Sequence, residues 1–131
     1  MKSKLILALS FFSLLLLPFG TLRAQNLESI SMAIQTGNAK EVAKYFDSSV
    51  EITVYNSEGV YSKAQAEMVL RDFFSKNPPT AFSLIHKGNS TQGSQYGIGT
   101  LSTSNGNFRA YIYVKQKGTT YFIQEIRFEK S

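Results

Sequence analysis

The spacing of apolar residues changes along the chain. Before residue 77 the apolar positions recur mainly every three to four residues, whereas from Ala81 onward they alternate with polar positions. The first spacing is typical of amphipathic helices, and the second is typical of strands that bury one face. The pattern therefore predicts helices in the first half of the chain and a sheet that takes up the second half.

Three helices are predicted in the first half. Asn38 and Ser62 each stand three residues before a Glu or Gln, which is the spacing of a helix-capping box. Gly37, and Asn77 in front of two prolines, are expected to end the first and third helices. The apolar stripes of the three helices are, in order, Leu27, Ile30, Ala33 and Ile34; Val42, Tyr45 and Phe46; and Ala66, Val69, Leu70, Phe73 and Phe74.

Alternation predicts the strands. The first spans residues 50–55, and a turn returns the chain as a brief partner strand at 60–61. Four further strands follow the third helix, at about residues 81–87, 95–103, 108–115 and 120–129. No helical segment separates these four strands, so they must run antiparallel to one another. The predicted fold class is α+β, in the order ααβ(β)αββββ: a curved antiparallel or mixed sheet wrapped on one face by three helices.

Glycines mark turns and bends in this sheet. Asn105-Gly106 is a strong signal for a tight hairpin. Gly97 and Gly99 lie inside a predicted strand, without the helix or the Gly-Lys-Ser/Thr sequence that a phosphate-binding loop requires. They therefore predict curvature of the sheet.

The first 24 residues have the three parts of a secretory signal. A basic start, Met-Lys-Ser-Lys, precedes an apolar run of 13 residues from Leu5 to Leu17, and the small residue Ala24 follows. A membrane-spanning helix needs about 20 apolar residues, so a stable membrane anchor is not expected. We expect cleavage after Ala24, export to the periplasm or the medium, and a single domain at residues 25–131.

Composition and charge narrow the possible functions. The chain has 131 residues, 43% of them hydrophobic, and a formal charge of +5. Three of the basic residues belong to the leader, which leaves a net charge of +2. A nucleic-acid partner is therefore not expected. The absence of cysteine and the presence of only one histidine exclude disulfides, thiolate zinc sites and multi-histidine metal sites, and no metal or cofactor is expected.

Several segments carry a family resemblance. Residues 33–46, followed by Val50-Glu51-Ile52, resemble the opening of nuclear transport factor 2-like domains, the SnoaL-like or cystatin-like cones. Residues 59–66, 73–79, 86–88 and 93–96 look more narrowly like domain of unknown function 4783, a secreted family of Gram-negative bacteria with no assigned activity. The likeness covers about residues 27–130. It implies a pocket between the concave sheet face and the helices and frequent dimerisation through the sheet, and it carries over no catalytic residue.

His86 is the first candidate for proton transfer, because the pKa of an unperturbed histidine lies near neutrality. Alternation puts it on the same side of its strand as Phe82 and Leu84, which predicts a place at the pocket. No neighbour in the sequence supplies an orienting carboxylate. A histidine bonded to the backbone is therefore favoured over a catalytic one.

Glu125 is the strand carboxylate with the clearest surroundings. Simple alternation puts it on one face with Tyr121, Ile123 and Arg127. The charge of Arg127 would hold Glu125 ionised, which favours an ion pair or ligand recognition over a catalytic base. No catalytic residue is assigned.

Two sets of site residues follow from the predicted faces. The pocket candidates are Phe46, Val69, Phe73, Phe82, Leu84, His86 and Phe108. Phe108, Ala110, Ile112 and Val114 continue with Phe122, Ile126 and Phe128 as the expected helix-covered face. The opposite face leaves the interface candidates Arg109, Tyr111, Tyr113, Tyr121 and Arg127. Tyrosine and arginine are enriched at protein interfaces.

Three functional hypotheses stay open. The first is a non-catalytic domain that binds a small apolar or amphipathic ligand, or a peptide, in the cone. The second is a proton-transfer enzyme of the isomerase or dehydratase type that uses His86 with a glutamate or tyrosine. The third is an interaction protein that acts through the tyrosine-rich sheet face, with the pocket filled by side chains. A homodimer through the sheet is a separate expectation about partners.

Overall fold

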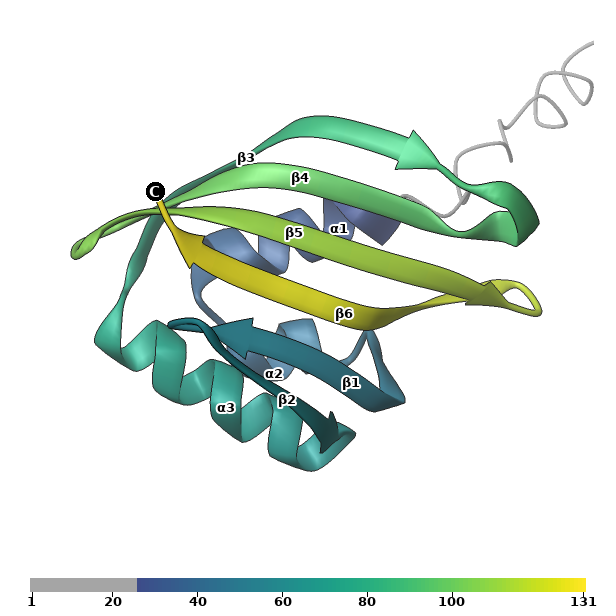
Figure 1. Cartoon of the computed structure of the whole chain (residues 1–131), viewed down its shortest axis with the longest axis horizontal. Coiled ribbons are helices and arrows are strands. Elements are labelled where there is room, and N and C mark those ends of the chain that lie inside the picture. The colour runs from purple at the N-terminus through teal and green to yellow at the C-terminus, as the bar shows by residue number, and fades with distance from the viewer. Residues whose placement is uncertain (1–25) are drawn as a thin grey trace, which may run out of the picture.

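The computed structural model describes residues 26–131, and the predicted signal peptide with its cleavage site lies outside them (Figure 1). The fold is α+β, as predicted. The helices are α1 (Asn26–Thr36), α2 (Ala39–Ala43) and α3 (Lys63–Lys76), with a short 3-10 turn η3 (Thr91–Gly93). The strands are β1 (Phe46–Val54), β2 (Ser57–Ser62), β3 (Pro79–Asn89), β4 (Gln95–Thr103), β5 (Gly106–Lys117) and β6 (Thr120–Lys130).

All six strands form one curved sheet in the order β2-β1-β6-β5-β4-β3 (Figure 1). The last four strands along the chain run antiparallel, as the lack of crossover helices predicts. The pair β1–β6 is parallel, and it joins the first hairpin to the other strands. The sheet is therefore mixed, and its centre is formed by β6 and β5.

The predicted helix ends are confirmed at their caps. The Asn38 side chain accepts a hydrogen bond from the Glu41 amide at 3.1 Å, and Ser62 with Gln65 forms a complete capping box. Phe46 differs from the prediction, because it opens β1 instead of closing α2. It pairs with Ile123 of β6, so sheet formation overrides the helical spacing at this position.

The hydrophobic core lies between the sheet and the helices. The ring of Phe73 on α3 stacks on Phe128 of β6, with centroids 4.7 Å apart, and meets the edge of Phe108 at 5.1 Å. All three side chains are buried. Gly99 lets β3 and β4 approach closely, since a Cβ there would lie 2.4 Å from the carbonyl oxygen of Ser83. The core is thus built of packed aromatic rings on one face of the sheet.

A buried carboxylate joins the start of β1 to the β5–β6 hairpin. Asp47 is 2.7 Å from the Lys117 ammonium, accepts a hydrogen bond from the Gln124 amide at 3.2 Å, and accepts another from the Ser48 backbone at 2.7 Å. The hydrogen bond with Lys117 is the main cause that lowers the pKa of Asp47, against the opposing effect of burial. This cluster links the start of β1 to the end of β5 and to Gln124 inside β6.

Within residues 26–131, no helix is both long enough and apolar enough to cross a membrane.

Candidate functional site

The helices leave one face of the sheet uncovered. In Figure 1, α1 passes behind β4, β5 and β6, and the near side of these strands carries no other element. We call this side the open face. Cross-strand pairing arranges its side chains in rows that run across several strands, so residues far apart in the sequence lie next to one another.

Two rows dominate the open face. The first runs from β1 to β4 through Glu51, Glu125, Tyr113 and Tyr96. The second runs from β1 to β3 through Thr53, Arg127, Tyr111, Ile98 and His86. We define the open-face patch as Glu51, Glu125, Arg127, Tyr96, Ile98, Tyr111 and Tyr113. All seven are partly buried, although no helix covers them.

The patch contains an ion pair beside a carboxyl pair. Arg127 Nε lies 3.2 Å from Glu125 Oε2, which confirms the predicted pairing, and the guanidinium carbon lies 4.7 Å from the ring centre of Tyr111. Hydrogen-bond contact with Glu125 is the main cause that raises the pKa of Glu51, followed by burial and by the like charge. Burial, and then the charge of Glu125, raises the pKa of Tyr111. Burial and neighbouring acidic groups therefore raise the pKa of one glutamate and one tyrosine of the patch.

His86 does not lie where alternation predicts. It is exposed, and its partner on β4 is Ile98 of the open face, whereas Leu84 pairs with Gly99 and faces the helices. Leu84 pairs with Gly99, and His86 pairs with the neighbouring Ile98, so Ile85 is an extra residue in β3 with no partner of its own in the β4 register. This β-bulge reverses the side on which the next side chain points. The predicted pocket position of His86 is wrong for this reason.

Tyr121 is also on the other side from the one predicted. Tyr113 pairs with Glu125, but the next residue, Val114, pairs with Ile123, so Gln124 is an extra residue in β6. Beyond this bulge Ile123 is buried and Tyr121 packs against the core. Tyr121 and Ile123 therefore do not share a face with Glu125, and Tyr121 is not part of the open-face patch. The same bulge takes Phe122 out of the expected helix-covered face.

The other interface candidates lie on the open face as predicted. Arg109, Tyr111 and Tyr113 alternate along β5 with core residues, and Arg127 lies beside Tyr111 on β6. Four members of the patch were not among the predicted interface candidates: Glu51, Glu125, Tyr96 and Ile98. Alternation within the strands predicts which side of its own strand each residue lies on. Only the order of the strands shows that these residues are neighbours.

The predicted pocket residues belong mostly to the core. Phe46, Phe73, Phe82 and Phe108 are buried in the hydrophobic core, and the half-buried Val69 and Leu84 pack against it. Neither of the two hollows described next is lined by any of these six residues.

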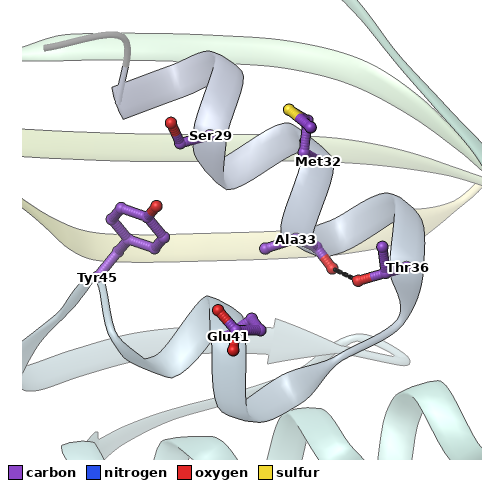
Figure 2. Close-up of a pocket in the computed structure, with 6 residues that line it drawn as sticks. All are labelled: Ser29, Met32, Ala33, Thr36, Glu41 and Tyr45. Atoms are coloured by element: carbon purple, nitrogen blue, oxygen red, sulfur yellow. Dashed lines mark hydrogen bonds between the residues drawn. The ribbon is translucent and has the colours of Figure 1, made fainter. Parts of the chain in front are cut away.

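A shallow groove of about 320 Å³ lies between α1 and α2 (Figure 2). Figure 2 shows Tyr45 on one side and the α1 side chains on the other, with the Glu41 carboxylate below. Thr36 Oγ1 is held by the Ala33 carbonyl oxygen at 2.7 Å, and Glu41 by Lys44 at 3.0 Å. The lining residues are Ser29, Met32, Ala33, Thr36, Glu41 and Tyr45.

A smaller polar hollow of about 160 Å³ lies at the β3–β4 loop. Ser94 in its wall is buried and accepts a hydrogen bond from the Tyr113 hydroxyl at 3.0 Å. The lining residues are Asn89, Ser90, Gly93, Ser94, Gln95 and Tyr121. Among the residues that the structure describes, no group of three or more histidine, cysteine, aspartate or glutamate side chains is placed to hold a metal ion.

Comparisons with known proteins agree with this fold. The family model of domain of unknown function 4783 (DUF4783) matches residues 27–129. A crystal structure of a DUF4783 family protein from Bacteroides uniformis is 31% identical with a TM-score of 0.78, and the alignment covers 82% of this chain and 98% of that one. A DUF4783 family protein from Bacteroides fragilis is 32% identical with a TM-score of 0.75, with 79% and 96% covered.

More distant structures share the fold alone. A nuclear transport factor 2-like protein of unknown function from Cytophaga hutchinsonii is 7% identical, with a TM-score of 0.57 over 80% of this chain and 86% of that one. No curated protein matches the chain.

Proposed function

This chain belongs to the DUF4783 family, and from that premise we propose that it is a non-catalytic protein-interaction domain whose partner surface is the open-face patch. The observation that carries this proposal is the arrangement of three tyrosines, an isoleucine and an arginine in two adjoining rows on an uncovered sheet face. Tyrosine and arginine are the residues that dominate binding energy at protein interfaces. The helix-covered face is already filled by its own aromatic rings.

The ionisable groups of the patch suit recognition better than proton transfer. Arg127 pairs with Glu125 and lies over the ring of Tyr111. These two contacts fix the position of its guanidinium group. Glu51 and Glu125 lie on an open sheet and not in an enclosed cavity, so water competes for any substrate and screens any developing charge. Fixed charges beside half-buried tyrosine rings are the composition of a binding surface.

Site-specific photo-crosslinking in cells that produce the full-length chain tests the proposal. A photo-reactive phenylalanine analogue replaces Tyr113 or Ile98 on the open face, and Met68 on α3 is the control, because it is equally apolar and 65% exposed. We expect discrete adducts from Tyr113 and Ile98 and none above background from Met68. The same low yield at all three positions would overturn the proposal.

The groove between α1 and α2 favours a second candidate function, the binding of a small amphipathic molecule. Its volume of about 320 Å³ reaches the lower end of the range of ligand pockets, roughly 300–1,000 Å³. Met32 and Tyr45 would contact the apolar part, and the Glu41 carboxylate would face a polar or cationic end. Mass spectrometry of the natively purified protein should then show a retained ligand that Met32→Lys removes. No retained ligand in the unchanged chain speaks against this candidate.

We also propose that the domain acts outside the cytoplasm, after removal of residues 1–24. The supporting observation is the signal-like leader in the sequence. An intact mass of the purified protein that begins at Gln25 is the expected result, and an intact mass of the whole chain contradicts it.

A further inference from the structure

The carboxylates of the chain fall into two groups. Residues 26–131 contain all nine aspartate and glutamate residues of the sequence, and six of them form ion pairs with lysine or arginine side chains of the same chain. Within this described part of the chain, Glu51, Glu58 and Glu129 form no ion pair. The paired carboxylates belong to Glu28, Glu41, Asp47, Glu67, Asp72 and Glu125.

All three unpaired carboxylates lie on the open face. Glu51 of β1 is next to Glu125 of β6 in the first row, and the pairing of β2 with β1 and of β6 with β5 puts Glu58 and Glu129 on the same side of the sheet. We define the acidic half of the open face as these four glutamates, on β2, β1 and β6. The one basic side chain on the open face of these three strands is Arg127, and it already pairs with Glu125. Negative charge that the chain does not balance is therefore concentrated on the surface that we assign to a partner.

Glu51 lies at the centre of the acidic half. Hydrogen-bond contact with Glu125 is the main cause that raises its pKa, followed by burial and by the like charge of Glu125, while a contact with Glu58 lowers it. The charge of Arg127 also lowers this pKa, but it has the smallest effect of these causes. A cation supplied from outside the chain, beside Glu51 and Glu125, would offset the repulsion between them.

We propose that the partner of the open-face patch is a different protein that presents lysine or arginine side chains, and that Glu51, Glu125 and Tyr113 together bind one of them. This inference rests on the proposed function and names the chemistry of its partner. It assigns the electrostatic part of the binding to the acidic half and the apolar part to the tyrosine rings.

The first row has the two components that bind a basic side chain. Tyr113 follows Glu125 in this row, so a ring lies beside the two carboxylates. Lysine and arginine carry a charged end on an apolar stem, so the end can contact the carboxylates while the stem packs on the ring. The second row already holds such an arrangement within the chain, where Arg127 contacts Glu125 and lies 4.7 Å from the ring centre of Tyr111.

The distribution of charge disfavours other partners. Nucleic acids and anionic membrane surfaces are negatively charged, so the acidic half would repel them. A second copy of this chain offers few free cations, because six of the 11 basic residues within 26–131 already pair with carboxylates of their own chain. A separate protein with an exposed basic segment fits the acidic half best.

Charge reversal at Glu51 tests the inference. The photo-reactive phenylalanine analogue replaces Ile98 in cells that produce the full-length chain, which leaves the carboxylates and Tyr113 unchanged. Adding Glu51→Lys should lower the yield of adducts at least about tenfold, because it puts a cation where the cation of the partner binds. Mass spectrometry of the adducts formed without Glu51→Lys should place the crosslinked segment of the partner next to lysine or arginine residues.

The matched control is Glu67→Lys. Glu67 is half-buried like Glu51, lies on α3 away from the open face, and undergoes the same change of charge. It should leave the yield of adducts unchanged. Circular dichroism of the purified variants shows whether each is folded. If Glu51→Lys does not fold, Glu51→Gln removes the charge with little change of shape and should lower the yield about threefold.

Three outcomes overturn the inference and leave the proposed function in place. An unchanged yield of adducts in folded Glu51→Lys shows that the partner does not recognise this carboxylate. Crosslinked segments without lysine or arginine, or adducts that join only two copies of this chain, show a partner of another kind. The absence of any adduct from Ile98 without Glu51→Lys overturns the proposed function, and the inference with it.

Discussion

The two faces of the sheet use aromatic residues in opposite ways. On the helix-covered face Phe108 and Phe128 are buried, and each contacts the ring of Phe73 on α3. On the open face Tyr111 lies beside the guanidinium of Arg127, and Tyr113 lies opposite Glu125 and donates a hydrogen bond from its hydroxyl to Ser94. The phenylalanine rings are wholly apolar and suit the core. The tyrosine rings of the open face also carry a hydroxyl group, which can form hydrogen bonds.

The aromatic residues of the two faces should contribute differently to stability. Removing a buried ring costs both its transfer free energy and the cavity left behind. Removing a ring from the open face leaves no cavity, because water or a partner fills the space. The two faces should therefore respond very differently to the same substitution.

The largest expected effect is at Phe73. Phe73→Ala should lower the free energy of unfolding by about 3–5 kcal/mol, whereas Tyr111→Ala should lower it by no more than about 1 kcal/mol. Urea denaturation followed by circular dichroism measures both. If Phe73→Ala does not fold, Phe73→Leu gives a smaller loss of the same kind, about 1–2 kcal/mol. Equal losses on the two faces would contradict the comparison.

A deletion in β3 tests whether the bulge determines which sheet face His86 lies on. Ile85 is the extra residue between Leu84, which faces the helices, and His86, which faces outward, so its removal joins two residues that already alternate. The deletion should leave the protein folded with a loss of about 1 kcal/mol, from the twist that the bulge supplies. Deletion of Tyr111, in a regular stretch of β5, should abolish folding because it moves core residues to the open face. A comparable loss from both deletions would show that the bulge is not the cause.

The smallest expected effect is on the open face and depends on pH. The pKa of Glu51 is raised in the folded chain, so its stabilising contribution is complete below the unfolded value, near 4.3, and is lost as the pH rises through the folded value. Glu51→Gln cannot lose this proton. It should therefore be more stable than the unchanged protein at pH 7–8, by less than about 1 kcal/mol because solvent screens the pair.

Thermal unfolding at pH 3.5 and at pH 7.5 measures this effect, and the difference between the two proteins should vanish at the lower pH. Glu67→Gln on α3 is the control, since it loses its ion pair with Arg71 and should not gain stability at either pH. A destabilised Glu51→Gln at neutral pH would show that the two glutamates do not repel each other.

The sequence predicted the fold well because local signals determine it. The caps at Asn38 and Ser62 and the tight turn between Thr103 and Gly106 each depend on a few neighbouring residues. The four strands from β3 to β6 follow one another without an intervening α-helix, which fixes their antiparallel order. The open-face residues of β5 were predicted for the same reason, since polar and apolar positions alternate strictly there.

The candidate site was predicted only in part, because two bulges reverse the alternation. At Leu84 and Ile85 two apolar residues follow each other, and at Phe122 and Ile123 two more do so. Either residue of each pair could face the core, so polarity alone does not reveal the extra residue. The pairing partners on β4 and β5 decide it, and these partners are distant in the sequence.

Because β1 pairs with β6, the last strand of the chain, the complete sheet can form only after nearly the whole chain has been synthesised. The chain makes β6 after every other described strand, yet β6 lies in the middle of the sheet and separates β1 from β5. A nascent chain that stops before Thr120 has two additional unpaired strand edges, on β1 and β5, and lacks Phe128, on which Phe73 stacks. The sheet therefore closes in one late step, and truncated chains expose the edges that promote aggregation.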